Sequence, residues 1–117
     1  MTAVFKAAEQ IEIGLAIAPQ LVPDDLAAVA ASCFSAVINN RPDDEDGEGQ
    51  PTSAQIEAAA RAAGLAYRHL PVPSAEHTAQ QAQAMMLLVG NPAQPVLAFS
   101  RTGRRSAALY RMGKSLP

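Results

Sequence analysis

Short apolar runs alternate along the chain with stretches whose apolar residues recur at helical spacing. The apolar runs have the length of buried strands and span residues 11–21, 34–40, 65–72 and 95–99. The helical stretches follow them, at about 23–33, 52–63, 77–89 and 106–114. Strands and helices that alternate in this way form mostly parallel sheets with both faces covered. The pattern therefore predicts an α/β fold, a single three-layer domain over residues 1–117 with helices on both faces of a central sheet.

Local signals mark both ends of one helical stretch and a buried stripe in the helical stretch before it. Thr52 and Gln55 have the spacing of a capping box, and Gly64 is placed to end the same helix in a left-handed conformation. In the preceding helix, the apolar stripe that begins at Leu26 extends to Cys33. Cys33 is therefore predicted to be a small buried hydrophobe.

Length and composition narrow the class of protein. A chain of 117 residues suits one domain with one core. No apolar run approaches the ~20 residues of a membrane helix. The first residues, MTAVFKAAEQ, lack the charged start and long apolar segment of a signal peptide. A single cysteine cannot form an internal disulfide, which fits a reducing compartment. We therefore expect a cytoplasmic location and no membrane partner.

Charge is divided unevenly between the two parts of the chain. Residues 1–76 hold eleven acidic and four basic residues, whereas residues 77–117 hold five basic residues and no acidic ones. Nucleic-acid-binding proteins usually spread their cations along a face with aromatic residues between them. Here three of the five cations fall within the five residues 101–105. This concentration favours a small anion as the ligand and argues against nucleic acid.

The stretch LAFSRTGRRSAALY (97–110) runs from a strand through a glycine turn into a helix. Such a junction turns backbone amides inward, the helix adds its positive end, and arginine supplies a planar fork of donors. The alternative is an ordinary turn with solvated arginines. The position directly after a buried strand favours an anion-binding loop. Its members are Arg101, Thr102, Gly103, Arg104, Arg105 and Ser106, with the Thr102 hydroxyl given either to the anion or to the turn.

Ser100 leads this loop, at the position where a nucleophile would stand. A cysteine there would have its pKa lowered by the helix end and by Arg105. A serine nucleophile needs a positioned base instead. Only His69 and His77 are available as bases, and neither lies in a recognisable triad arrangement. We therefore interpret Ser100 as standing in the place of a missing cysteine, either in an altered sequence or in a natural inactive copy.

With these residues considered, the chain resembles the bacterial phosphatase-like domain of the β-lactamase-hydrolase-like proteins, a family also labelled sulfur transferase. The resemblance rests on IAPQL (17–21), INNRPD (38–43), PVP after the strand LAYRHL, and PVLAFSRTGRRS (95–106). It implies a fold similar to that of dual-specificity phosphatases, with the catalytic cysteine at position 100. The serine departs from this pattern, which puts catalysis in doubt but leaves anion binding intact.

The resemblance implies two reactions for a cysteine form. Phosphatases of this type place five residues between the cysteine and the arginine, whereas four separate Ser100 from Arg105. With a cysteine at position 100, the order of residues 100–105 is similar to that in the active loop of rhodanese-type sulfurtransferases, which surrounds a persulfide. We therefore expect a thiol-dependent sulfurtransferase type of domain, with a small sulfur species and an acceptor thiol as partners. The family also implies a persulfide dioxygenase of metallo-β-lactamase fold as a partner. Phosphate-monoester hydrolysis and non-catalytic anion binding are the alternatives.

A phosphatase would also need an acid that protonates the leaving oxygen. Glu76 is the only acid in PVPSAEH, although it also suits the first turn of the following helix. Asp43 and Asp44 are the other candidates, in an acidic run that either is solvated or folds over the cationic pocket together with Arg41. A metal site is not expected, because the chain has two histidines and one cysteine and their spacing does not suit metal ligands. No cofactor is expected either.

Overall fold

A computed structural model of the chain describes residue 5 and residues 7–117. The strands are β1 (Glu9–Glu12), β2 (Leu15–Ala18), β3 (Ala36–Asn39), β4 (Ala66–His69) and β5 (Val96–Phe99). The helices are α1 (Leu26–Ala31), α2 (Ser53–Ala62), α3 (Ala79–Val89) and α4 (Arg104–Ser115). Two short 3-10 turns, η1 (Pro23–Asp25) and η2 (Gly47–Gly49), precede α1 and α2.

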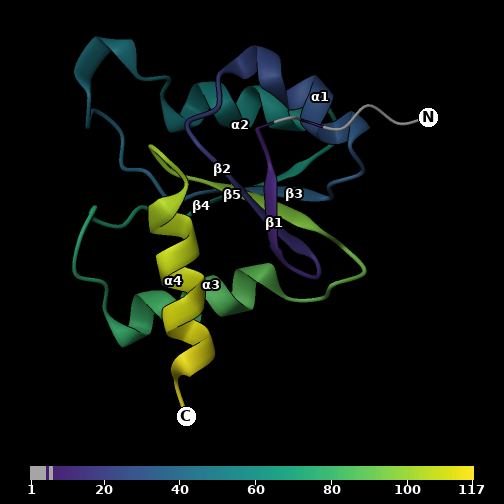
Figure 1. Ribbon diagram of the computed structural model, residues 1–117. Helices are drawn as coiled ribbons and strands as arrows, with labels where there is room; N and C mark the ends of the chain where they lie inside the picture. Colours follow the sequence, from purple (N-terminus) through teal and green to yellow (C-terminus); the bar gives the residue numbers. More distant parts are fainter. Residues whose placement is uncertain (1–4, 6) are drawn as a thin grey trace.

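The strands form one sheet in the order β1-β2-β5-β3-β4. β2, β5, β3 and β4 run parallel to one another, and β1 is antiparallel to its neighbour β2. Figure 1 shows α1 and α2 on one face of the sheet and α3 and α4 on the other. The predicted three-layer α/β architecture with a mostly parallel sheet is therefore confirmed.

The first apolar run forms two strands, which corrects the prediction of a single strand over 11–21. The chain turns back at Gly14, where φ is +85°, so that β1 pairs antiparallel with β2. A Cβ added at Gly14 would lie 2.7 Å from the Cα of Pro92, so this turn has no room for a side chain. The sequence suggested one continuous strand because Ile13, which lies at the turn, is apolar. In the structure 72% of Ile13 is exposed.

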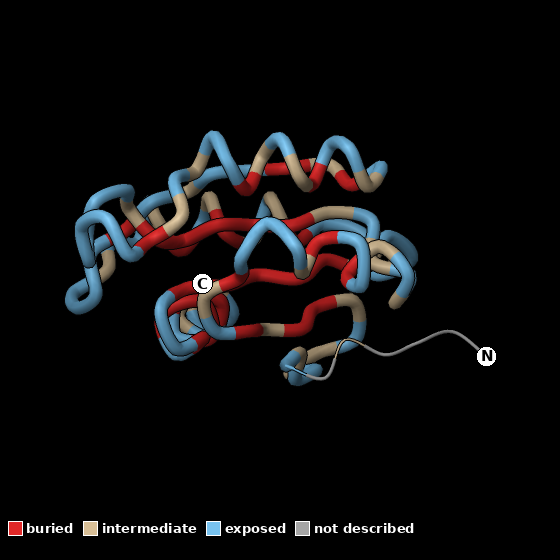
Figure 2. Tube along the Cα trace, turned by 90° about the horizontal axis from the view of Figure 1, so that it is seen from above, coloured by how far each residue is buried: buried red, intermediate tan, exposed pale blue. Residues whose placement is uncertain are grey.

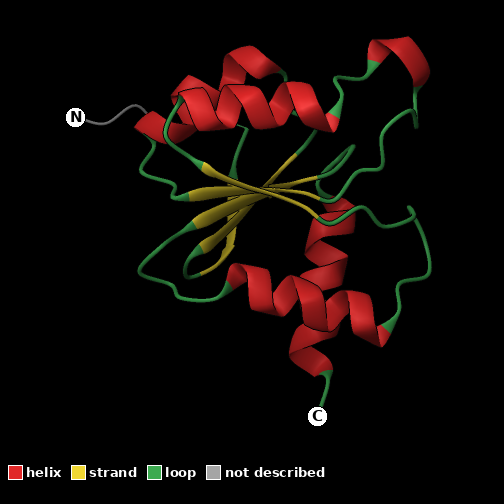
Figure 3. Ribbon diagram, turned by 180° about the vertical axis from the view of Figure 1, so that it is seen from behind, coloured by secondary structure: helices red, strands yellow, loops and turns green. Residues whose placement is uncertain are grey.

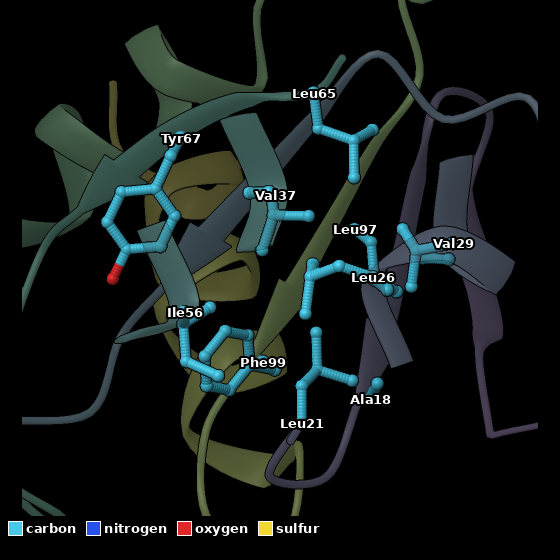
Figure 4. Packing of buried hydrophobic residues seen from close by; sticks show 12 residues of the cluster. Ala18, Leu21, Leu26, Val29, Val37, Ile56, Leu65, Tyr67, Leu97 and Phe99 are labelled. Carbon is cyan, nitrogen blue, oxygen red and sulfur yellow. The ribbon is translucent and has the colours of Figure 1, made fainter. Parts of the chain in front are cut away.

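Alternate residues of the central strands face opposite helical layers, as expected for parallel strands buried on both faces. In β5, Leu97 and Phe99 belong to the core cluster shared with α1 and α2, whereas Val96 and Ala98 belong to the cluster shared with α3 and α4. Figure 4 shows the first cluster at close range, with Phe99 beside Ile56 of α2. In Figure 2 the sheet is mainly buried, while the outer turns of the helices are exposed.

The first helix is shorter than its apolar stripe suggested. Leu26 and Val29 are buried as predicted, but α1 ends at Ala31. Cys33 lies beyond that end with φ +70° and is exposed, which corrects the prediction that it is buried. The helical periodicity does not apply to a residue that has already left the helix.

The other helix boundaries follow the expected signals closely. Thr52 Oγ1 accepts a hydrogen bond from the Gln55 backbone N–H at 3.1 Å, and Gln55 Oε1 accepts one from the Thr52 N–H at 2.9 Å, so the predicted capping box is present. α3 begins at Ala79, two residues later than predicted, and α4 begins at Arg104, two residues earlier. No helix among the described residues has both the length and the apolar character needed to cross a bilayer.

Candidate anion-binding site

Three loops meet at the carboxyl ends of the parallel strands. They follow β3, β4 and β5, and Figures 1 and 3 show that all of them leave the sheet on the same side. They carry the acidic run, the PVPSAEH segment and the glycine–arginine loop. Because neighbouring parallel strands end at one edge, residues far apart in sequence are brought together here, as is usual for ligand sites in such sheets.

Ser100 is fully buried at the end of β5, and one backbone amide is aimed at its side chain. The Gly103 N–H donates a hydrogen bond to Ser100 Oγ at 3.1 Å. Gly103 has φ +93°, and a Cβ added to it would lie 3.2 Å from the carbonyl oxygen of Ala18. Glycine therefore serves two needs here, a left-handed backbone conformation and a close approach to β2.

The positive end of α4 adjoins this turn. Arg104 is the first residue of a helix of twelve residues, so the amides of its first turn have no partners within the helix. Thr102 Oγ1 accepts a hydrogen bond from the Arg104 N–H at 3.3 Å. Of the two uses considered for the Thr102 hydroxyl, the structure shows the bond to the turn.

Arg105 points inward, whereas Arg101 and Arg104 are exposed at the rim. Only 7% of Arg105 is exposed. Its Nη1 donates to Glu45 Oε2 at 2.9 Å and to the Val72 carbonyl oxygen at 3.1 Å, and its Nη2 donates to Glu45 Oε1 at 3.1 Å. Glu45 therefore occupies the edge of the guanidinium formed by Nη1 and Nη2.

Two consecutive residues of α4 have a buried side-chain atom without a hydrogen-bond partner among the described residues. These atoms are Nε of Arg105 and Oγ of Ser106, and Asn40 Oδ1 is a third such atom. A guanidinium has a second edge, formed by Nε and Nη2, that can donate two parallel hydrogen bonds. Buried polar groups are normally paired, so these two atoms are open to an acceptor that the described residues do not supply. Arg105 lines the pocket described below, whereas Ser106 does not.

Arg41 lies behind Glu45 and holds the acidic loop in place. It is 3% exposed. Its Nε donates to Glu45 Oε1 at 2.8 Å, its Nη2 to Asp46 Oδ2 at 2.6 Å, and its Nη1 to Gln20 Oε1 at 2.9 Å. The acidic run thus folds over the cationic loop, which was one of the two possibilities for it. Arg41 itself contacts the carboxylates and does not line the pocket.

These contacts shift the pKa values of the groups involved. Burial alone would raise the pKa of Glu45, but hydrogen bonds from Arg105 and Arg41 outweigh it and hold the pKa below its ordinary value. The hydrogen bond from Arg41 likewise lowers the pKa of Asp46. Burial opposes the charge of Arg41, yet its two carboxylate partners raise its pKa. Glu45 is therefore ionised at neutral pH.

A pocket of about 230 Å³ opens in front of Ser100. Its lining residues come mostly from the loop that joins β5 to α4, with one from the segment after β4: Ser74, Ser100, Arg101, Thr102, Arg104 and Arg105. All of these side chains are polar or cationic, and none is acidic. The pocket thus has the size and charge to hold a small anion.

The carboxylates named from the sequence lie elsewhere. Asp43 Oδ1 accepts a hydrogen bond from the Ser53 N–H at 2.7 Å, so it fastens the acidic loop to the start of α2. Asp44 occupies a turn with φ +65°. Glu76 is exposed, has φ +59° and lies three residues before Ala79, the first residue of α3, so it is not in a first helical turn as suggested. None of these three residues lines the pocket.

Sequence reasoning did not single out Glu45 or Ser74. The acidic run was noted as able to cover the cations, but five acids in six residues offer no signal for which one does. Ser74 is small and polar in a proline-rich loop, a combination that is common in turns. Only the three-dimensional meeting of loops distinguishes these two residues.

The histidines have structural contacts. His69 Nε2 is 2.9 Å from the Arg41 carbonyl oxygen, and His77 Nε2 is 3.0 Å from the Pro73 carbonyl oxygen. Neither ring lines the pocket that contains Ser100, and Cys33 does not line it either. Within the described part of the chain, Ser100 therefore has no base placed to activate it.

Comparison with known proteins gives a consistent picture. The model of a family described as the phosphatase-like domain of Beta-lactamase hydrolase-like proteins matches residues 7–117. A Beta-lactamase hydrolase-like protein of Agrobacterium fabrum is 35% identical over 109 residues, which make up 93% of this chain and 25% of that protein. One from Xylella fastidiosa is 34% identical over 100 residues, 86% of this chain and 23% of that protein. The chain thus spans about a quarter of the length of these relatives.

Solved structures also resemble this chain. A candidate phosphatase from Neisseria meningitidis has a TM-score of 0.80 at 30% identity, over 100% of this chain and 81% of that one. Tk-PTP in its active form has a TM-score of 0.68 at 21% identity, over 83% of this chain and 63% of that one, a likeness of fold alone. The phosphatase-like fold expected from the sequence is confirmed.

Proposed function

Because the chain belongs to the family of phosphatase-like domains of β-lactamase hydrolase-like proteins, we propose that it binds a small oxyanion or thio-anion at residues 100–106 and does not turn it over while serine occupies position 100. The observation that carries this proposal is the pair of buried, unpartnered donors, Arg105 Nε and Ser106 Oγ. Both belong to the first turn of α4, whose positive end favours an anion.

The anion would occupy the free edge of Arg105. Glu45 already takes the Nη1–Nη2 edge, so an oxyanion would bind the Nε–Nη2 edge in the bidentate manner that arginine favours. The Gly103 amide, now bonded to Ser100 Oγ at 3.1 Å, would be a further donor close by. Glu45 thus orients the guanidinium without blocking the edge that the anion needs.

The absence of turnover follows from the surroundings of Ser100. A hydroxyl becomes a nucleophile when a base takes its proton, and the histidines hydrogen-bond to backbone carbonyls away from Ser100. The Ser100 hydroxyl oxygen accepts a hydrogen bond from the Gly103 amide, and this contact does not help to remove the hydroxyl proton. The same surroundings would favour the thiolate of a cysteine, because amides and arginine stabilise its negative charge.

For a variant with a thiol at position 100, the site favours sulfur transfer over phosphate hydrolysis. Hydrolysis of a phosphate ester needs a protonated acid at the leaving oxygen, but no acidic residue lines the pocket and Glu45 is held ionised. Sulfur transfer from thiosulfate needs no such acid. The thiolate attacks the outer sulfur, the sulfur–sulfur bond breaks, and sulfite leaves with the electron pair. An acceptor thiolate then removes that sulfur and restores the first thiolate.

The binding proposal is tested by titrating the protein with sulfate and with phosphate. Binding is monitored by the chemical shifts of the backbone amides. We expect residues 100–106 to shift most, and Arg105→Ala to weaken binding by about tenfold or more, since hydrogen bonds to charged groups contribute about 1.5–3 kcal/mol. Arg111→Ala is the matched control, since Arg111 is exposed further along α4. Equal losses in both variants would mean that the cations act only as a diffuse field.

Ser100→Cys then separates the two reactions. The variant is assayed with thiosulfate plus an acceptor thiol and, separately, with an aryl phosphate. Sulfite release with thiosulfate is the expected result. Hydrolysis of the aryl phosphate without any sulfur transfer would contradict the preference for sulfur transfer, while leaving anion binding in place.

A further inference from the structure

One wall of the pocket comes from a different part of the chain than the rest. Ser100, Arg101, Thr102, Arg104 and Arg105 all belong to the junction of β5 and α4, whereas Ser74 belongs to the segment that links β4 to α3. The junction supplies the groups that would hold an anion. Ser74 is thus a lining residue of the same pocket that comes from outside the anion-binding loop.

The segment that carries Ser74 is fastened to the anion site. The Val72 N–H donates to the Asn40 carbonyl oxygen at 3.2 Å, and the Val72 carbonyl oxygen accepts from Arg105 Nη1 at 3.1 Å. Val72 is 1% exposed. Nε2 of His77, which follows Ser74 in the chain, lies 3.0 Å from the Pro73 carbonyl oxygen. The arginine that would bind the anion thus also holds the backbone two residues before Ser74.

A bound anion would have a defined orientation in this pocket. Its oxygens would be directed to Arg105 Nε and to the donors of the first turn of α4, which lie on the junction side. A substituent on the anion would then point away from the junction, and Ser74 is the lining residue that the junction does not supply. A serine there leaves room for a substituent that a larger side chain would obstruct.

We infer that Ser74 is a specificity-determining residue, which contacts the substituent of a monosubstituted anion held at residues 100–106. This inference rests on the proposed function and adds to it the class of ligand: an anion that carries an organic group, and not only the free inorganic ion. Ser74 is exposed, so its replacement does not disturb the buried core.

Two ligands and two variants test this inference. Inorganic phosphate and phenyl phosphate are titrated into the wild-type protein, Ser74→Phe and the control Ala75→Phe. Ala75 is the next residue of the same exposed segment and does not line the pocket. Ser74→Phe is expected to weaken phenyl phosphate about tenfold or more, because overpacking typically costs ~1–3 kcal/mol, and to change phosphate less than about twofold. Ala75→Phe is expected to leave the affinity for both ligands within about twofold.

Each other outcome has a distinct meaning. If Ser74→Phe weakens both ligands equally, or leaves phenyl phosphate unchanged, the role of Ser74 is wrong although the anion site stands. The same holds if Ala75→Phe has as large an effect as Ser74→Phe. If the wild-type protein binds neither ligand, the proposed function itself fails, and the inference with it.

Discussion

Glu45 is the residue whose removal is expected to have the most informative effect on stability. Its carboxylate is shared by two buried arginines, Arg41 at 2.8 Å and Arg105 at 2.9 Å. Glu45→Gln removes the charge and keeps the shape. Arg41 retains Asp46 as a partner, whereas Arg105 loses the carboxylate that occupies two of its nitrogens.

The magnitude follows from the burial of the pair. Removal of one partner from a fully buried ion pair lowers the free energy of unfolding by about 3–5 kcal/mol, because the other charge stays buried without compensation. The side chain of Arg105 is 6% exposed but that of Glu45 is 26% exposed, so water screens part of the interaction. We therefore expect Glu45→Gln to lower the free energy of unfolding by about 1–2 kcal/mol.

Urea unfolding monitored by circular dichroism measures this change, with Glu57→Gln as the matched control. Glu57 pairs with Arg61 at 2.8 Å, but their side chains are 40% and 62% exposed, and such a helical pair contributes only about 0.3–0.5 kcal/mol. Added sulfate should restore part of the stability of Glu45→Gln, because a ligand that binds only the folded state stabilises it. A loss no greater than that of Glu57→Gln would refute the account of the buried network.

Three further predictions concern the loop and the acidic network. Ser100→Cys should give a thiol whose pKa lies below the ordinary value of about 8.5, measured by the pH dependence of alkylation; a thiol that reacts like free cysteine would contradict the positive pocket. Gly103→Ala should lower the free energy of unfolding by about 1–2 kcal/mol more than Gly64→Ala in the same urea assay. Both glycines have positive φ, but a Cβ at Gly103 would lie 3.2 Å from the Ala18 carbonyl oxygen, whereas a Cβ at Gly64 would contact nothing. Equal effects would mean that the approach to Ala18 is unimportant. Because the folded-state pKa of Glu45 is lowered, its stabilisation is full above its unfolded pKa and is lost as pH falls through the folded value. Acid unfolding curves should therefore show a smaller loss for Glu45→Gln than for the wild type, and parallel curves would contradict this.

The sequence predicted what local patterns determine. The alternation of strand and helix fixed the parallel sheet, and the position of SRTGRRS after an apolar strand placed the loop at the correct edge. The capping box at Thr52 was identified because its contacts lie within three residues. These features depend on spacing, which a single sequence displays directly.

The errors have a different physical origin. Gly14 interrupts an apolar run, but whether the chain bends or reverses there depends on its contact with Pro92, which is far away in sequence. Glu45 and Ser74 are likewise defined by contacts with the loop at 100–105. Such long-range contacts have no local signature. The sequence therefore predicted an anion-binding loop, but it indicated neither the residue that orients Arg105 nor the contribution of Ser74 to the pocket lining.

A crystal structure of the protein in the presence of selenate would test the central claim most directly. The anomalous signal of selenium would locate the bound anion. We predict an anion within hydrogen-bond distance of Arg105 Nε and Ser106 Oγ, the two donors that lack partners now, with the Glu45–Arg105 ion pair intact. Selenate bound only at exposed arginines, with Arg105 Nε still unpaired, would contradict the account.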